Sequence, residues 1–387
     1  MLRFLTAGES HGPQLTAILD GIPAGLLLSS DDIDRDLAKR QVGYGASPRM
    51  KIEHDHAQLT AGVLGGHTIG APIALTIANL DHEKWKDRDI APMTVPRPGH
   101  ADLTGAIKYG YRDLRLALER ASARETAARV AIGAICRKLL QEFGVAIGSY
   151  VVSIGTVEAS IDDEINYLDR FARADQSDVR CPDPEAAEKM HAEIRATMEA
   201  KDTVGGVTEV VALHVPPGLG SHVQWDRRLS GRLVGALSSV HAMKGVEIGP
   251  AFENARKRGT QVHDEILRDG DRLTRATHRS GGLEGGITTG DPIVLRVAMK
   301  PIATTLNPLR SVDLATGEET RTHYERSDFC PVPRAGVILE AMTAFVLADA
   351  LIEKLGGDSL TEMKPRFEQL RQARLEDLLM DNLTWKF

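Results

Sequence analysis

The alternation of hydrophobic and polar positions along the chain predicts long helices interleaved with strands. One helix is predicted over residues 123–143, and its stretch 127–136 is apolar almost all round, which is typical of a helix buried between two layers. Ser122 and Glu125 have the spacing of a capping box at the start of this helix, and Gly144 provides a stop. A second helix is predicted over residues 334–355, between a pair of prolines and a pair of glycines.

A repeated pattern of glycines and apolar residues predicts a duplicated sheet unit. The segment 65–75 recurs as 285–295, at a constant offset of 220 residues. In both copies a glycine turn precedes a strand of apolar residues. A related piece over residues 205–213 is either a further copy or a chance match. Spacing of this kind favours an ancient duplication over a solenoid, whose repeats are shorter and more numerous.

The rest of the pattern predicts one large domain. Residues 160–202 are charged and predict helices on the outside of the molecule, while the charged tail 358–387 carries scattered apolar residues and has no evident role. Strands and helices do not alternate strictly, and no long Ser-, Gly- or Pro-rich linker divides the chain. We therefore expect an α+β fold in a single domain over residues 1–387.

Composition excludes several classes of function. Among the 387 residues, 42% are hydrophobic and 26% are charged, which is ordinary for a soluble globular protein. Aromatic residues make up 4% and the net charge is −7, so neither a nucleic-acid surface nor an anionic-membrane surface is expected. The N-terminus lacks the pattern of a signal peptide, and no stretch predicts a membrane span. Three cysteines without metal-ligand spacing predict free thiols in a reducing cytoplasm.

Three short segments carry residues suited to proton transfer. His11 lies in a glycine-rich turn, His100 lies in the stiff loop 96–102 with two prolines, and Asp328 follows Arg326 closely. Imidazole is the side chain best suited to moving protons near neutral pH, and a stiff loop places it at little entropic cost. Each histidine also has a plainer interpretation, as the cap of a strand end or as part of a surface loop. Their joint occurrence favours a proton-transfer site assembled from distant loops.

Several cationic residues lie where an anion could bind. Arg120 and Arg124 flank the predicted start of the first helix, where they oppose the helix dipole unless an anion binds there. Arg40 and Arg49 flank a glycine loop, which is either an anion site or a solvated basic loop. Lys300 ends the strand of the second repeat and is followed by hydroxyl residues, an arrangement that suits a phosphate.

The segment His54-Asp55-His56 is a pattern that suggests a metal. A His-x-His pair on a strand directs both imidazoles to one face and can ligate a metal ion. Because no carboxylate-rich or cysteine motif accompanies the pair, we expect no metal site.

Taken together, these segments resemble the chorismate synthase family. The resemblance extends in order from Met1 to about Leu355. It rests on three signatures, over residues 8–23, 120–133 and 326–342. One signature alone would be weak evidence, but three in the family's order argue strongly against coincidence.

The resemblance implies a fold, an activity and a set of ligands. Family members are homotetramers whose protomers hold helices between two antiparallel sheets, in a β-α-β sandwich. They convert 5-enolpyruvylshikimate 3-phosphate to chorismate by 1,4-anti elimination of phosphate, the last common step of the shikimate pathway to the aromatic amino acids. The reaction requires reduced FMN although it involves no net redox change, and some relatives reduce the flavin with NADPH.

The resemblance also implies roles for individual residues. His100 would protonate the departing phosphate, His11 would supply a proton to the flavin near N1, and Asp328 would help flavin N5 to remove the ring proton. The family's flavin-binding positions correspond to Arg120, Ala121, Ser122, His241, Ala242, Gly285, Lys300, Pro301, Ile302, Ala303, Thr304 and Arg326. Its substrate-binding positions correspond to Ser10, Arg40, Arg49 and Arg124.

The chain departs from the family pattern at three positions. Ala46 stands where many relatives have arginine, so one anion contact is absent or comes from Arg49 or Lys51. Ala121 stands where others have serine, and the change is tolerable because Ser122 still provides the cap of the predicted helix. His241 stands where many relatives have asparagine, and both side chains can donate a hydrogen bond.

Two other functions remain open at the level of sequence. A flavin- or NADPH-dependent oxidoreductase would need a nicotinamide site, and the chain lacks a G-x-G-x-x-G turn after a strand. A non-catalytic sensor of phosphorylated metabolites would keep the fold and bind the ligands. The intact His11, His100 and Asp328 argue instead for an enzyme.

Overall fold

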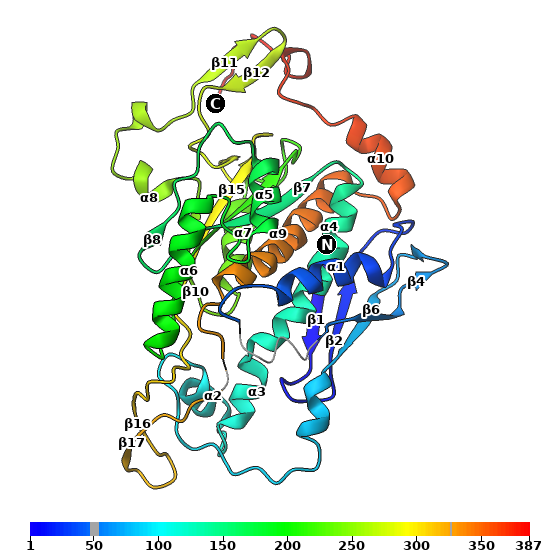
Figure 1. The fold of residues 1–387 in the computed structure, drawn as a ribbon. Helices are drawn as coiled ribbons and strands as arrows, with labels where there is room; N and C mark the ends of the chain where they lie inside the picture. Colours follow the sequence, from blue (N-terminus) through cyan, green and yellow to red (C-terminus); the bar gives the residue numbers. More distant parts are fainter. Residues whose placement is uncertain (47–53, 326) are drawn as a thin grey trace.

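Two antiparallel sheets enclose a central layer of helices (Figure 1). The computed structural model describes residues 1–46, 54–325 and 327–387. In spatial order, the strands of the first sheet are β1 (Arg3–Ala7), β2 (Gln14–Asp20), β6 (Ile73–Ala78) and β3 (Ala57–Ala61). Those of the second sheet are β10 (Met243–Ile248), β15 (Ile293–Met299), β9 (Gly206–Leu213), β7 (Ala146–Ile154) and β8 (Val157–Glu158). The predicted α+β fold, with helices between two antiparallel sheets, is confirmed.

The central layer is built on two apolar helices that pack against each other, α4 (Thr126–Gln141) and α9 (Val332–Leu355). α4 packs on the first sheet and α9 on the second, while α1 (Ser30–Gln41) and α7 (Leu229–Ser238) flank them. Most residues of both central helices are buried, because apolar side chains surround each helix. α9 is long and apolar enough to cross a membrane, but 78% of that apolar window is buried inside the protein, as in a core helix.

The structure confirms both predicted core helices and corrects how the first one begins. A short 3₁₀ turn, η3 (Ala123–Glu125), precedes α4, and the Ser122 hydroxyl accepts a hydrogen bond from the backbone of that turn at 3.3 Å. The predicted capping box is wrong, because the Glu125 carboxylate has other partners. It accepts hydrogen bonds from Thr6 at 2.7 Å and from Arg129 at 2.9 Å.

The two sheets and their helices are copies of one unit. The first sheet has the order β1-β2-β6-β3, and the second has the order β7-β9-β15-β10 with β8 added beside β7. In both halves the chain forms two strands, a helix, a strand, a small hairpin, a strand and finally a long central helix. The duplication therefore covers a whole sheet with its helices.

Two small hairpins show the duplication at the level of single hydrogen bonds. They are β4 (Val63–Leu64) with β5 (His67–Thr68), and β13 (Leu283–Glu284) with β14 (Ile287–Thr288). The Thr68 hydroxyl donates to the Pro23 carbonyl at 2.7 Å and accepts a backbone N–H at 3.0 Å. The Thr288 hydroxyl donates to the Pro216 carbonyl at 2.7 Å and accepts a backbone N–H at 2.8 Å. The repeat predicted at an offset of 220 residues is confirmed.

The piece over residues 205–213 is not a further copy of the hairpin-and-strand unit. It forms β9, which pairs with β15 over the whole length of both strands. β9 therefore occupies the place that β2 has beside β6 in the first sheet.

The outer faces of the two sheets differ. The charged segment 160–202 forms α5 (Tyr167–Gln176) and α6 (Pro184–Glu199), as predicted. α5 covers the outer face of the second sheet, whereas α6 packs against β7 and β8 beside the start of α9. Within the part of the chain that the structure describes, no such segment covers the first sheet. There Leu5 is 75% exposed and Ile18 is 41% exposed.

The remaining elements are short. They are η2 (Leu80–Lys84), α2 (Asp102–Tyr109), α3 (Arg115–Ala121), η4 (Trp225–Arg227), α8 (Ala251–Asn254), η5 (Gly259–Gln261), β11 (Ile266–Asp269), β12 (Arg272–Arg275), β16 (Arg310–Val312), β17 (Glu319–Arg321), α10 (Leu360–Glu368) and η6 (Leu375–Asp377). α2, α3 and the β16-β17 hairpin lie at one end of the sandwich, and the β11-β12 hairpin and the C-terminus lie at the other (Figure 1).

Candidate active site

The strand register brings the loops of both halves to one end of the sandwich. Gln14, which begins β2, pairs with Ala78, which ends β6. Gly206, which begins β9, pairs in the same way with Met299, which ends β15. The loops that start or finish at this end are 8–13, 79–125, 155–205, 239–242 and 300–331, together with the connection from α1 to β3.

Residues 120–126, which lead into α4, connect several of these loops. The Arg120 guanidinium donates to a carbonyl at the end of β1 at 2.8 Å. The Ser122 hydroxyl lies 3.0 Å from the Ser10 hydroxyl and donates to it. From the last turn of α1, Arg40 donates to the Thr126 hydroxyl at 3.1 Å and to a carbonyl of η3 at 3.0 Å. The entry into α4 is thus the meeting point of the predicted residues.

His11 is held by a carboxylate from α3. Its Nδ1 lies 2.7 Å from Oε1 of Glu119, and its backbone N–H donates to Oε2 of the same residue at 2.8 Å. Burial alone would raise the pKa of Glu119, but the hydrogen bonds from His11 outweigh burial and lower that pKa. The imidazole also packs on Trp85, with ring centroids 4.2 Å apart. With Nδ1 engaged, Nε2 is the nitrogen available to a ligand.

His100 is held by a carboxylate that an arginine shares. Its Nδ1 lies 2.6 Å from Oδ1 of Asp102 and 3.0 Å from Nη2 of Arg97, and the shorter contact assigns the Nδ1–H to Asp102. Arg97 donates to both oxygens of Asp102, at 2.8 and 2.9 Å. Burial alone would raise the pKa of Asp102, but the hydrogen bonds from Arg97 and His100 hold it well below its usual range.

Arg40 and Arg124 are buried and share the carboxylate of Asp55. Arg124 donates to Asp55 at 2.6 Å and to Asn79 at 2.7 Å, while Arg40 donates to Asp55 at 3.4 Å. Burial lowers the pKa of Arg40 to about 10, Asp55 opposes this effect, and nearby guanidinium groups add to it. The positive charge of Arg124 interacts unfavourably with the helix dipole, and the ion pair with Asp55 offsets this interaction within the protein.

Asp328 belongs to the same buried cluster. It forms an ion pair with Arg334 in the first turn of α9, and both groups act electrostatically on Arg40. Together with the pair of Arg124 and Asp55, the described cluster holds three guanidinium groups and two carboxylates, and so carries one excess positive charge. Nη1 of Arg334 is buried and has no hydrogen-bond partner among the described residues. An anionic ligand would neutralise the excess positive charge and would accept a hydrogen bond from Nη1 of Arg334.

His241 lies between α7 and β10, close enough to His100 and Arg120 to interact electrostatically with both. Burial lowers the pKa of His241, Glu125 opposes this effect, and the neighbouring cationic groups reinforce it. The Nδ1 atom of His241 is buried without a hydrogen-bond partner in the described part of the chain. The site therefore holds a polar atom that still needs a partner.

The segment 300–304 lies against the loop of His100. The Lys300 N–H donates to the Ala242 carbonyl at 3.0 Å, and its Nζ donates to the Gly99 carbonyl at 3.1 Å. The Thr304 hydroxyl accepts a hydrogen bond from Arg97 at 3.2 Å. These contacts join the end of β15 to the His100 loop and to the turn before β10.

Comparison with known proteins supplies the context for this geometry. The family model described as chorismate synthase matches residues 2–352. The chorismate synthase of Aquifex aeolicus is 56% identical, over 95% of this chain and 96% of that protein. The chorismate synthase of Rubrobacter xylanophilus is 52% identical, over 94% of this chain and 95% of that protein. A crystal structure of a chorismate synthase superimposes with a TM-score of 0.78 at 49% identity, over 95% of this chain and 96% of the other. The chain belongs to the chorismate synthase family.

Family membership fixes the general activity of the protein. Like other chorismate synthases it is an enzyme, a carbon–oxygen lyase, and it serves the biosynthesis of aromatic amino acids. The resemblance inferred from the three sequence signatures is confirmed.

Of the positions predicted from the chorismate synthase pattern, one lies away from the site and two fall outside the described residues. Gly285 lies in the turn between β13 and β14, at the opposite end of β15 from Lys300. It lines a separate cavity of about 610 Å³ together with Arg228. Arg49 and Arg326 lie outside the described residues.

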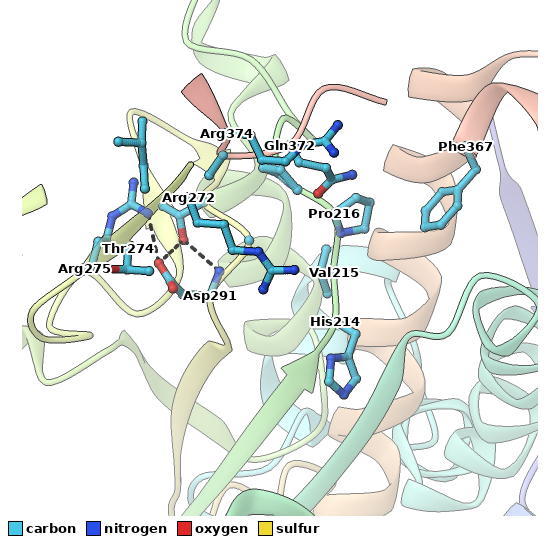
Figure 2. Close-up of a pocket in the computed structure, with 15 residues that line it drawn as sticks. His214, Val215, Pro216, Arg272, Thr274, Arg275, Asp291, Phe367, Gln372 and Arg374 are labelled. Carbon is cyan, nitrogen blue, oxygen red and sulfur yellow. Dashed lines mark hydrogen bonds and ion pairs between the residues drawn. The ribbon is translucent and has the colours of Figure 1, made fainter. Parts of the chain in front are cut away.

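A further hollow at the far end of the sandwich contains none of the predicted chorismate synthase positions (Figure 2). It has a volume of about 460 Å³ and lies between the end of β9, the strand β12 and the segment after α10. Figure 2 shows Arg272 directed into it, whereas Arg275 is held by Asp291 at 3.0 Å.

Two residues of the segment 54–56 have partners within the protein. Asp55 binds the two buried arginines, and the His56 ring contacts Asp34. Among residues 1–46, 54–325 and 327–387, no group of three or more His, Cys, Asp or Glu side chains is arranged to hold a metal ion.

Three residues at the chorismate synthase site are not evident from the sequence: Asp102, Glu119 and Arg334. Asp102 could be found from its position two residues after His100 in the same stiff loop. Glu119 and Arg334 lie on helices, and a helical pattern does not tell which loop such a helix will face.

Proposed function

We propose that the protein converts 5-enolpyruvylshikimate 3-phosphate to chorismate by 1,4-anti elimination of phosphate, with reduced FMN as cofactor. The observation that carries the proposal is that the loops of His11 and His100 and a buried arginine cluster meet around residues 120–126. Such a site offers proton donors and positive charge to a substrate with one phosphate and two carboxylates. Membership of the chorismate synthase family supports the same reaction.

The anionic groups of the substrate would bind to the cationic end of the site. We propose Ser10, Arg40 and Arg124 as substrate contacts, with Arg49 from the segment outside the described residues. Because a carboxylate already bonds both buried guanidinium groups, they act through the excess positive charge of the cluster. We add Arg334, whose buried Nη1 lacks a partner among the described residues. A bidentate guanidinium contact suits a carboxylate or a phosphate.

The proton-transfer roles follow from the hydrogen bonds of each side chain. His100 gives Nδ1–H to Asp102, so its Nε2 is the atom that would donate a proton to the departing phosphate. His11 gives Nδ1–H to Glu119, so its Nε2 would hold the proton delivered near flavin N1. Asp328, kept in place by its ion pair, would assist removal of the ring proton.

The residues around His241 fit a flavin. The buried Nδ1 of His241 lacks a partner in the described structure, and Arg120 and His100 lie nearby, so a polar planar ligand would satisfy it. When bound, reduced FMN supplies an electron-rich ring system whose N5 takes part in removing the substrate's ring proton. The proposed contacts are Arg120, Ala121, Ser122, His241, Ala242, Lys300, Pro301, Ile302, Ala303, Thr304 and Arg326.

We extend the proposal to a homotetramer. Leu5 and Ile18 are exposed on the first sheet, whereas α5 covers the matching face of the second sheet, so a second protomer would cover the bare face. Gly285, which lies away from the other flavin positions, would then contribute from a neighbouring protomer. Leu5→Glu should lower the molar mass measured by light scattering, and an unchanged mass would contradict this interface.

NADPH is our candidate for the reductant of the flavin, and the cytoplasm is our proposed location. Three buried free thiols are suited to a reducing compartment. Chorismate formation with NADPH in the absence of oxygen would establish NADPH as the reductant of the flavin. Chorismate formation with dithionite but not with NADPH would exclude that role.

The decisive experiment is an anaerobic assay for the two products. The protein should release phosphate and chorismate in equal amounts when dithionite-reduced FMN is present, and neither product with oxidised FMN or with no flavin. Binding of substrate and flavin without product would favour a sensor, and phosphate release without flavin would contradict the proposed reaction.

A further inference from the structure

One carboxylate holds His11 in two ways. Oε1 of Glu119 lies 2.7 Å from the ring Nδ1, and Oε2 accepts the His11 backbone N–H at 2.8 Å. The two residues are 108 positions apart in the chain. A single side chain from α3 therefore fixes both the backbone and the ring orientation of the candidate proton donor.

Two further contacts restrain the same imidazole. Its ring packs on Trp85, with centroids 4.2 Å apart and planes inclined by 45°. The His82 Nδ1–H donates to the His11 carbonyl at 2.8 Å. Within the described residues, Nε2 of His11 makes no hydrogen bond to the protein. The ring is therefore held at Nδ1 and against Trp85, and its backbone is held on both the N–H and the carbonyl side.

The charges around His11 favour an ionised Glu119. Burial alone would raise the pKa of Glu119, but hydrogen bonds from His11 and the attraction of Arg115 lower it, so the carboxylate is charged at neutral pH. Further charged or titratable neighbours are His82 from η2, Glu9 from the same loop, and Arg120, which donates to a carbonyl of that loop at 3.4 Å.

The partner of His100 provides the contrast. Asp102 also accepts an Nδ1–H, but Arg97 donates to both of its oxygens and offsets its charge. Glu119 has no such bidentate arginine among the described residues. Asp102 therefore divides its hydrogen bonds between His100 and Arg97, whereas both oxygens of Glu119 bond to His11.

We propose that Glu119 is a positioning residue for His11, which fixes the Nδ1–H and the orientation of the ring so that Nε2 is the nitrogen that holds the transferable proton. The inference rests on the proposed function only for the use of that proton. The hydrogen bonds and their effect on the ring can be tested without substrate or flavin.

The first test uses ¹⁵N-resolved NMR of the imidazole groups at a fixed pH, without substrate or flavin. In the wild-type protein, the Nδ1–H of His11 should exchange slowly with water, because the Glu119 carboxylate accepts it. In Glu119→Gln this exchange should be faster by ~10-fold or more, because the hydrogen bond to a charged group is lost. Glu9→Gln, which removes a neighbouring exposed carboxylate, should leave the exchange rate unchanged.

An unchanged exchange rate of the His11 Nδ1–H in Glu119→Gln would overturn the proposal whether or not the protein makes chorismate. If that variant does not fold, a wild-type His11 without a protected Nδ1–H would overturn it equally. Lack of chorismate formation by the wild type would instead count against the proposed function.

The second test separates positioning from a general structural role. Glu119→Gln should lower kcat by at least ~10-fold with KM changed less than about two-fold, because binding does not depend on the proton. Glu119→Asp keeps the charge and should recover a large part of the loss. Equal loss in the Gln and Asp variants, or a loss confined to KM, would contradict the positioning role.

Discussion

At the scale of single residues, both candidate proton donors use the same arrangement. His11 and His100 each give Nδ1–H to a carboxylate and keep Nε2 for a ligand. Such a pair fixes the tautomer and the orientation of the ring. Orientation matters because a group misplaced by about 1 Å can lose on the order of a hundredfold in rate.

Alanine at either histidine should therefore remove catalysis and spare the fold. His11→Ala and His100→Ala should each lower kcat by ~10²–10⁴-fold, the usual contribution of one acid–base group. The measurement is turnover with chemically reduced FMN, together with thermal melting to check the fold. His214→Ala, at the far end of the sandwich, is the control and should keep wild-type turnover. Normal rates in both test variants would remove these side chains from the mechanism.

His241 should make the stability of the folded protein depend on pH in mild acid. Because its pKa is lowered in the folded state, the unfolded chain binds the proton more readily below about pH 6.5. The contribution of His241 to the free energy of unfolding is therefore lost as the pH falls from about 6.5, the pKa in the unfolded chain, through the lower pKa in the folded protein.

His241→Asn has no such proton to bind and should lose less stability on acidification. The check is urea unfolding of both proteins at about pH 7.5 and about pH 5.5. Equal losses of unfolding free energy in the two proteins would show that His241 does not titrate in this way.

The two histidines can be found from the sequence, but their partners only in part. Glycine and proline around His11 and His100 are local signals of a fixed loop. Asp102 shares the loop of His100, whereas Glu119 reaches His11 only because the fold brings α3 beside the β1-β2 loop. In the sequence Asp55 lies within a metal-like motif, and only the structure shows that it pairs with arginines.

At the scale of elements, the contact between α4 and α9 depends on a glycine. A Cβ atom added at Gly133 would lie 2.2 Å from the Cβ of Ala341. The two helices can approach this closely only because one of them lacks a side chain at that point. Glycine in the middle of α4 therefore serves packing, although it lowers helix propensity.

Two glycine-to-alanine changes should have opposite effects. Gly133→Ala should destabilise the protein by ~1–3 kcal/mol, because the added methyl group forces packed helices apart. Gly235→Ala in α7, where a Cβ would meet nothing within 4 Å, should stabilise it by ~0.5–1 kcal/mol. Urea unfolding gives both free energies, and effects of the same sign would contradict the role assigned to Gly133.

The core helices follow from the sequence because burial on all sides leaves a plain apolar signal. The second helix is predicted over residues 334–355 and spans Val332–Leu355. The predicted capping box before α4 is wrong because Glu125 bonds to Thr6 on β1 and to Arg129 on the helix that follows. A local capping pattern cannot report a partner that arrives from another element.

At the scale of the whole molecule, the duplicated architecture explains why the site residues come from such distant segments. Each half sends its loops to the same end, because both sheets are antiparallel and have the same order. Only the hairpin repeat is visible in the sequence. Gly21 and His214 occupy matching positions two residues before a proline, both with positive φ, yet their identities differ. When matching positions keep their conformation but change their residues, the sequence shows no repeat there. The single domain over residues 1–387 stays a prediction.

The hydroxyl groups of Thr68 and Thr288 should contribute equally to the free energy of unfolding. Thr68→Val and Thr288→Val should each cost ~1–3 kcal/mol, because each leaves a buried carbonyl and a buried N–H without their partner. The double variant should show the sum within ~0.5 kcal/mol, since the two hydroxyls share no partner. Chemical unfolding of the three variants measures this, and strongly unequal or non-additive costs would contradict the equivalence.

The packing of α4 on α9 has a consequence for descent. A polypeptide of half this length would leave one side of its long helix bare, and only by associating with an identical subunit could it shield that side. The reaction chamber would then have lain on the symmetry axis of an ancestral dimer. Fusion of two such copies would release each half from identity, and in the present chain one half carries His11 and His100 and the other carries His241 and Asp328.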